Sequence, residues 1–132
     1  MCGRCKDLTV NDENFFCLYD AKEICGREYT VQEVLSEIIK DKTFYETSGG
    51  GVTFSGGECM LYVDFLTELA SVCKNMGVSV AIDTAGNVPY EYFERIMPLT
   101  DMFLYDVKCF TESLHRQGVG VSNALILDNL KR

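Results

Sequence analysis

The sequence predicts an α/β fold with a parallel sheet, and two patterns lead to this prediction. Short apolar runs with strand character alternate along the chain with segments whose apolar residues recur at helical spacing. Because each connection between two runs is long enough only for a covering helix, the strands must pair in parallel through right-handed crossovers. Polar residues also follow each apolar run directly, at the strand ends where parallel α/β folds bind ligands.

Composition limits the chain to one globular core and a narrow set of partners. It has 132 residues, 47% of them hydrophobic, and a net charge of -8. Without a run of lysine or arginine, it lacks the electrostatic footprint for nucleic acid or an anionic membrane. No apolar run approaches the ~20 residues of a membrane span, and the start of the chain is no signal peptide. We therefore expect a cytoplasmic protein whose partners are proteins or small molecules.

The seven cysteines are the second informative feature of the composition. An odd number in a chain of this kind favours reduced thiols or metal ligands over disulfides. The segment over residues 1–27, with a polar stretch from Lys6 to Asn14, contains Cys2, Cys5, Cys17 and Cys25. Its C-x2-C pair puts two thiolates on one turn, as zinc and iron-sulfur sites do, but the remaining spacing fits no standard ferredoxin pattern. Metal ligation and free thiols both remain open for this segment.

Thr30 and Glu33 form a capping-box pattern at the start of the first predicted helix. Apolar residues then recur at helical spacing, which predicts one helix as far as about Lys42. These residues are Val31, Val34, Leu35, Ile38 and Ile39. The next predicted element is a strand over Gly51–Phe54, with a glycine cluster on either side.

A second helix is predicted after Glu58, and Gly77 ends it. Its apolar stripe consists of Tyr62, Phe65, Leu66, Leu69, Cys73 and Met76, with Cys73 interpreted as a core residue. A continuous apolar run over Val78–Ile82 predicts the second strand, and Pro89 and Pro98 then bound a short helix.

A third buried strand is predicted over Met102–Tyr105. Helical segments follow, with Thr111 and Ser122 as candidate N-caps. The apolar residues of these segments include Leu125, Ile126 and Leu130. The lone histidine, His115, is interpreted as a solvated helix residue, with a contact in the tail of the chain as the alternative.

The glycine clusters around the first strand differ from the two common phosphate-binding motifs. Gly51-x4-Gly56 is followed by Gly57-Glu58, where a P-loop needs lysine and then serine or threonine. Gly118-Val119-Gly120 is not followed by the third glycine of a dinucleotide motif. Glycines after the strand leave backbone N–H and C=O groups bare for a small polar ligand. The acid at Glu58 favours a cationic ligand group such as an amine, and a plain glycine-rich turn is the alternative.

Polar residues end all three predicted strands. Ser55-Gly56-Gly57-Glu58 follows the first, Asp83-Thr84 the second and Asp106-Val107-Lys108 the third. Because the carboxyl ends of parallel strands share one face, these motifs converge on one predicted site. A single Asp after a strand is more often a helix cap, but three polar strand ends in register favour a ligand site.

The motifs Gly50–Glu58, Asp83–Gly86 and Asp106–Lys108 resemble the glycyl radical enzyme activating enzymes, radical S-adenosylmethionine (SAM) proteins similar to pyruvate formate-lyase activase. The resemblance implies a partial (βα)6 radical SAM barrel over residues 28–132, preceded at 1–27 by the end of a ferredoxin-like iron-sulfur insert. It implies that Gly56, Gly57 and Glu58 hold the methionine amino group of SAM. It further implies that the SAM pocket and a nearby monovalent-cation position are lined by Asp83, Thr84, Asp106, Val107 and Lys108.

The resemblance also implies a reaction and its partners. A reduced four-iron four-sulfur (4Fe-4S) cluster cleaves SAM to methionine and a deoxyadenosyl radical, which removes a hydrogen atom from a glycine Cα of the partner, a glycyl radical enzyme. An electron donor such as flavodoxin or ferredoxin is implied as well. An auxiliary cluster would use Cys2, Cys5 and Cys17. No catalytic side chain is assigned in this sequence.

The sequence departs from the family pattern in its cysteines. The cluster motif C-x3-C-x2-C is absent, Cys59 stands where the family usually has proline, and Leu8 stands where a compact ferredoxin motif would place a cysteine. We therefore expect a fragment of a longer activase that is inactive by itself. The alternatives are a catalytically incomplete α/β piece that binds SAM or a partner, and a small iron-sulfur electron carrier built on the N-terminal cysteines.

Overall fold

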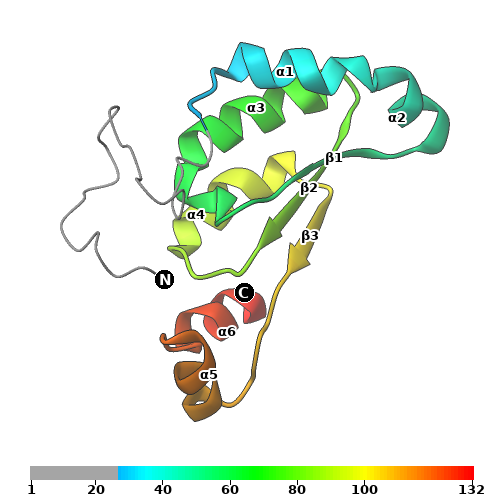
Figure 1. Ribbon diagram of the computed structural model, residues 1–132. Helices are drawn as coiled ribbons and strands as arrows, with labels where there is room; N and C mark the ends of the chain where they lie inside the picture. Colours follow the sequence, from blue (N-terminus) through cyan, green and yellow to red (C-terminus); the bar gives the residue numbers. More distant parts are fainter. Residues whose placement is uncertain (1–26) are drawn as a thin grey trace, which may run out of the picture.

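The computed structural model describes residues 27–132, which form a three-stranded sheet with helices (Figure 1). The strands are β1 (Gly51–Phe54), β2 (Ser79–Thr84) and β3 (Met102–Tyr105), in the order β1-β2-β3. Both pairings are parallel, with Phe54 opposite Ile82 and Thr84 opposite Tyr105. The predicted α/β class and partial barrel of parallel strands are confirmed.

The capping box predicted at Thr30 is present at the start of α1 (Val31–Lys40). The Thr30 hydroxyl accepts a hydrogen bond from the Glu33 N–H at 3.2 Å, and the Glu33 carboxylate accepts one from the Thr30 N–H at 2.7 Å. The prediction of a single helix to about Lys42 is wrong, because a second helix, α2 (Lys42–Ser48), follows. None of the α2 residues is buried, so the sequence carries no apolar stripe that could reveal it.

The helix predicted after Glu58 begins with a 3-10 turn, η1 (Cys59–Tyr62), and continues as α3 (Val63–Asn75). The 3-10 turn changes the helical phase, so Met60 and Val63 face the core. The placement of Tyr62 on the buried stripe is therefore wrong, since it is 73% exposed. Gly77, with φ of +75°, ends the helix as predicted, and Cys73 is buried in the core as predicted.

The later helices complete the described chain. They are α4 (Tyr90–Ile96), the 3-10 turn η2 (Met97–Leu99), α5 (Glu112–Val119) and α6 (Ala124–Lys131). Figure 1 shows α5 and α6 beyond the carboxyl ends of the strands. Thr111 is the N-cap residue of α5, whereas Asn123 rather than Ser122 is the N-cap residue of α6.

The interpretation of His115 as a solvated residue is wrong. Its side chain is only 2% exposed, and its Nδ1 lies 2.8 Å from the carbonyl oxygen of Val121. The connection between α5 and α6 places this carbonyl, six residues further along the chain, against the imidazole, and this contact leaves no trace in the helical pattern of α5.

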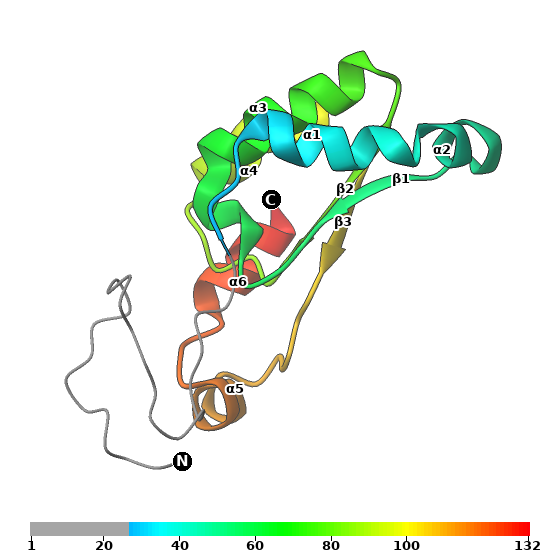
Figure 2. The same cartoon turned by 45° about the horizontal axis from the view of Figure 1, so that its top comes forward.

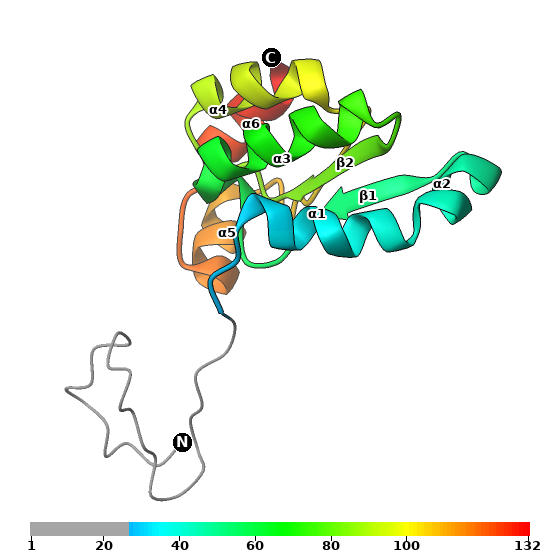
Figure 3. The ribbon, with the colours of Figure 1, turned by 90° about the horizontal axis from the view of Figure 1, so that it is seen from above.

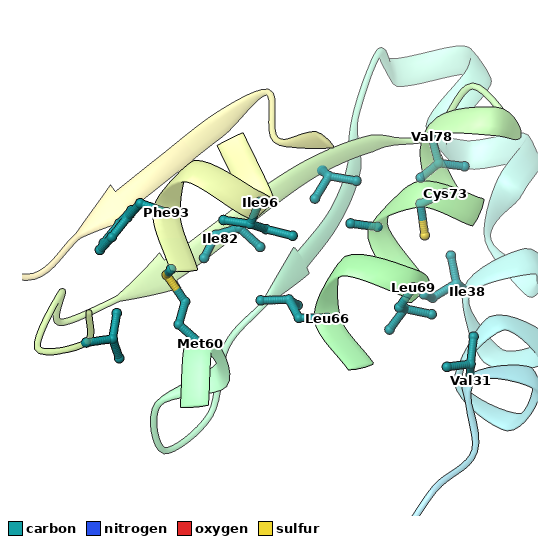
Figure 4. Packing of buried hydrophobic residues seen from close by; sticks show 13 residues of the cluster. Val31, Ile38, Met60, Leu66, Leu69, Cys73, Val78, Ile82, Phe93 and Ile96 are labelled. Atoms are coloured by element: carbon teal, nitrogen blue, oxygen red, sulfur yellow. The ribbon is translucent and has the colours of Figure 1, made fainter. Parts of the chain in front are cut away.

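The core lies on one side of the sheet. Helices α1, α3 and α4 gather on this side (Figure 2) and follow one another across it (Figure 3). Their side chains meet those of β2 in one cluster (Figure 4), which includes Ile38, Leu66, Leu69, Ile82 and Ile96. The other side, here called the open face, bears exposed side chains of Thr53, Met102 and Leu104.

The amino ends of β2 and β3 are joined by Asp101. Its carboxylate accepts hydrogen bonds from the Lys74 ammonium at 2.5 Å and from the Val80 N–H at 2.8 Å. These contacts hold the pKa of Asp101 below its ordinary value, with the bond from Lys74 as the larger cause. Among the helices within residues 27–132, none is long and apolar enough to cross a membrane.

Candidate cofactor-binding site

The chain leaves β1 through the turn Gly56-Gly57, whose φ angles of +89° and +50° lie in the left-handed region. No atom lies within 4 Å of a Cβ built on either residue. The backbone conformation, rather than crowding, therefore makes glycine necessary here. The consequence is a stretch of bare backbone at the carboxyl end of β1.

Glu58 ties this turn to the end of β2. Its Oε1 accepts hydrogen bonds from the Met60 N–H at 3.1 Å and from the Thr84 hydroxyl at 2.8 Å. Its Oε2 accepts one from the Ala85 N–H at 3.0 Å. Three donors of the same chain therefore already engage the Glu58 carboxylate, which fixes the turn in place.

Thr84 and Asp83 point to opposite sides of β2, as neighbouring strand residues do. Thr84 is 2% exposed, and its hydroxyl, besides donating to Glu58, accepts a hydrogen bond from the Gly86 N–H at 3.0 Å. Asp83 lies on the open face, where its carboxylate accepts a hydrogen bond from the Ser55 hydroxyl at 2.9 Å.

Asp106 comes to the same edge from β3. Its N–H donates to the carbonyl oxygen of Thr84 at 2.9 Å, and its carboxylate forms an ion pair with Lys108. The register pairs Asp83 with Leu104, and alternation along the strand then puts Asp106 on the open face with Asp83. Val107, between the two charged residues, is partly buried. The strand-end residues expected to share an edge therefore do so.

Cys59 lies next to Glu58, between the ends of β1 and β2. Its Sγ is 3.5 Å from the carbonyl oxygens of both Phe54 and Asp83. Burial, followed by the nearby charge of Glu58, raises the pKa of this thiol to about 11. The side chain is therefore a neutral thiol that donates to the backbone, unlike the thiolate that a metal site needs.

Tyr105 and Gly86 also belong to this region, although neither was among the predicted site residues. The Tyr105 hydroxyl donates to the carbonyl oxygen of Ile126 at 2.7 Å. A Cβ on Gly86, where φ is +71°, would lie 1.8 Å from that hydroxyl oxygen. Burial and then the charge of Glu58 raise the pKa of Tyr105. Gly86 could have been suspected from its place after a strand, but no spacing connects it with Tyr105.

The predicted cluster ligands Cys2, Cys5 and Cys17, and the proposed domain over residues 1–27, lie outside the described residues apart from Arg27. Within residues 27–132, no group of three or more His, Cys, Asp or Glu side chains could hold a metal ion. The side chains of this part of the chain therefore offer no ligand set for an iron-sulfur cluster.

A sequence profile of the Radical SAM superfamily matches residues 15–132. The chain belongs to this superfamily, whose members use SAM and a 4Fe-4S cluster.

Its relatives are activating enzymes. The chain is 49% identical to the trans-4-hydroxy-L-proline dehydratase activating enzyme of Clostridioides difficile over 85% of its length, and 41% identical to the choline trimethylamine-lyase activating enzyme of Oleidesulfovibrio alaskensis over 83%. It spans 37% and 36% of these curated relatives.

One solved structure is similar in fold and sequence. A domain of a pyruvate-formate lyase-activating enzyme from Bacteroides vulgatus matches 63% of this chain, with a TM-score of 0.58 and 35% identity. The match covers 52% of that chain.

Proposed function

We propose that this chain forms the SAM-binding part of an enzyme that activates a glycyl radical enzyme. The observation that carries the proposal is the bare Gly56-Gly57 turn, which Glu58 fixes to the end of β2 beside Asp83 and Asp106. Membership of the superfamily and the names of the relatives support it.

The polar groups of SAM have complementary groups at this edge of the sheet. The ammonium of the methionine part suits the carbonyl groups of the Gly56-Gly57 turn and the negative charge of Glu58, and its carboxylate suits the Lys108 ammonium. Because three donors already engage Glu58, we assign the direct ammonium contact to the turn and a supporting role to the Glu58 side chain. Thr84 fixes Glu58, and we assign Val107 to the lining of the SAM site.

We also propose a monovalent cation beside Asp83 and Asp106. Both carboxylates lie on the open face, and such oxygen ligands suit a hard cation. A dependence of SAM binding on sodium or potassium would support this position. Equal binding in a bulky organic cation buffer would contradict it.

The cluster and the partner enter this proposal through the superfamily. The cluster and SAM together supply the radical chemistry, and the 132 residues contain no C-x3-C-x2-C to hold that cluster. The relatives are named for a dehydratase and a lyase, so we propose a glycyl radical enzyme as the partner class, with flavodoxin or ferredoxin as electron donor. We place the protein in the cytoplasm.

A reconstitution experiment tests the proposed activity. This chain, and a chimera in which a radical SAM segment bearing C-x3-C-x2-C precedes residue 1, are each treated with iron, sulfide, dithionite and SAM. We expect deoxyadenosine from the chimera and none from the chain alone. With a glycyl radical enzyme present, electron paramagnetic resonance should detect a glycyl radical. Turnover by the chain alone, or none by a chimera that carries its cluster, would contradict the proposal.

A second candidate function is a catalytically incomplete module that only binds SAM or a partner. The absence of C-x3-C-x2-C favours it. A chimera that carries its cluster and binds SAM, yet yields neither deoxyadenosine nor a glycyl radical, would favour this alternative.

A further inference from the structure

Helix α6 binds the loop after β2 through Asn129, which is 6% exposed. The Asn129 side-chain NH2 group donates to the carbonyl oxygen of Gly86 at 2.9 Å and to that of Val88 at 2.8 Å. The Gly86 and Val88 positions are buried, so these carbonyls have little access to water. The loop's backbone therefore depends on α6 for these hydrogen bonds.

Asn123, which directly precedes α6, makes the same kind of contact with the loop after β3. Asn123, the N-cap residue of α6, is 2% exposed. Its NH2 group donates to the carbonyl oxygens of Cys109 and Phe110, both at 2.9 Å. One asparagine at each end of α6 thus holds two backbone carbonyls of a different strand-end loop.

A third contact lies between the two asparagines. The carbonyl oxygen of Ile126 accepts a hydrogen bond from the Tyr105 hydroxyl at 2.7 Å, and the Tyr105 ring occupies the space beside Gly86. The last residue of β3 is therefore connected both to the middle of α6 and to the loop after β2.

The chemistry of these contacts requires an amide. Both N–H groups of Asn129 face carbonyl oxygens, whereas its Oδ1 is buried without a hydrogen-bond partner. In the flipped orientation, Oδ1 would face two carbonyl oxygens and repel them. An aspartate would bring that repulsion together with a buried charge. Asn129 thus makes two hydrogen bonds to the loop even though its own Oδ1 is left without a hydrogen-bond partner.

We propose that α6 is a clasp, with Asn123 and Asn129 as positioning residues that set the distance between the loops after β2 and β3. The first loop follows Asp83 and Thr84 and contains Ala85, whose N–H donates to Glu58. The second contains Asp106 and Lys108, directly before the carbonyls of Cys109 and Phe110 that Asn123 holds. The spacing of the carboxylates and the ammonium at the site therefore depends on a helix that contributes no side chain to it. The SAM part of this proposal rests on the proposed function.

Amide hydrogen exchange measured by NMR on the 132-residue chain tests the clasp without any cofactor. The reporters are the N–H groups of Ala85 and Gly86, which donate to Glu58 and Thr84. Replacing Asn129 by leucine (Asn129→Leu) removes two hydrogen bonds to the loop, so exchange at both reporters should accelerate about tenfold. Tyr105→Phe keeps the ring and removes only the bond to α6, and it should accelerate exchange at Gly86 by a smaller factor.

Asp101→Ala is the matched control, because it removes a bond to the backbone at the opposite end of the strands. It should accelerate exchange at Val80, whose N–H donates to Asp101, and leave Ala85 and Gly86 unchanged. Wild-type exchange at Ala85 and Gly86 in a folded Asn129→Leu overturns the proposal, as does wild-type exchange at Gly86 in Tyr105→Phe or equal acceleration in Asp101→Ala. If Asn129→Leu does not fold, the Tyr105→Phe result decides.

A titration with SAM then extends the test to the site. Asn129→Leu and Tyr105→Phe should bind SAM more weakly than Asp101→Ala does. The affinity is read from the changes in the NMR chemical shifts of Gly56 and Gly57 as SAM is added. Wild-type affinity in both variants overturns the positioning role. If the wild-type chain shows no SAM-dependent shifts, the proposed function fails for this chain, whereas the exchange result still decides whether the clasp exists.

Discussion

The two ends of the sheet are held together in different ways. At the amino end, Asp101 joins β2 to α3 through Lys74 and the Val80 N–H, and both charged side chains remain more than a third exposed. At the carboxyl end, Glu58 and buried Thr84 form a network that reaches across the strands. An exposed ion pair adds little stability, whereas removing one member of a buried polar network is costly because its partners are left without hydrogen bonds.

The difference shows what each end is suited for. A sheet that needed only stability could close both ends with apolar side chains or exposed pairs. The carboxyl end instead holds a glycine turn and two loops at defined positions. It does so with buried polar groups, and removing one of them leaves its hydrogen-bond partners unsatisfied, which is costly. We therefore expect substitutions at the carboxyl end to affect stability and ligand binding together, and substitutions at the amino end to affect stability alone.

The largest expected effect on stability is at Gly86. Alanine there combines a φ of +71° with a Cβ 1.8 Å from the Tyr105 hydroxyl. We expect Gly86→Ala to lower the free energy of unfolding by about 3 kcal/mol, measured by urea denaturation. Gly57→Ala is the control, because φ there is also positive but the space is open, and it should cost about 1 kcal/mol. Equal losses in the two variants would contradict the crowding at Gly86.

Glu58→Ala is next in size. It leaves the Thr84 hydroxyl and two backbone N–H groups without their acceptor, and it should cost about 2 kcal/mol of unfolding free energy. Asp101→Ala, its counterpart at the amino end, should cost less than about 1 kcal/mol because that side chain is exposed. Similar losses at both ends would remove the distinction between them.

The sequence predicts those features of the molecule that depend on neighbouring residues. The capping box at Thr30, the first and third strands and the end of α3 at Gly77 are local patterns, and the structure contains them. The second strand was predicted over Val78–Ile82 but runs over Ser79–Thr84, so the polar pair Asp83 and Thr84 belongs to it. Helix α2 escaped prediction because it buries no residue. Tyr62 was predicted to be buried because the α-helical spacing of α3 was applied to a segment that forms a 3-10 turn.

The site was predicted only as far as strand ends can indicate it. The sharing of one edge by Asp83 and Asp106 follows from parallel pairing, and the structure has this arrangement. Two of the three partners of Glu58, Thr84 and Ala85, lie at the end of β2, and the contacts of Asn129 join a loop to a helix that follows it at long range. Such pairs have no fixed separation in the sequence, so only the folded structure shows them.

Asp83→Ala distinguishes a ligand site from a structural cap. Asp83 contacts the Ser55 hydroxyl and no backbone N–H, so its loss should cost less than about 1 kcal/mol of unfolding free energy. SAM affinity should fall about tenfold, which corresponds to about 1.4 kcal/mol. Asp64→Ala, which removes a 91% exposed aspartate from α3, is the control for charge. A melting temperature that falls while SAM binding stays unchanged would assign Asp83 a structural role.

The smallest expected effect concerns the acid dependence of the amino end. The bonds from Lys74 and Val80 hold the pKa of Asp101 below its ordinary value of 3.8 in the folded chain. Because the folded pKa is the lower one, Asp101 contributes stability above pH 3.8, and this contribution is lost as the pH falls through the folded pKa. The side chain is 41% exposed, so the contribution should stay below about 1 kcal/mol.

Urea denaturation at pH 6 and at pH 3 measures this contribution. Acid should lower the free energy of unfolding less in Asp101→Asn than in the wild type. Glu33 and Glu112, whose pKa values are also lowered, titrate in both chains, so the difference between the chains isolates Asp101. Identical acid-induced losses would mean that this carboxylate adds nothing, and that the amino end is held by packing and backbone pairing alone.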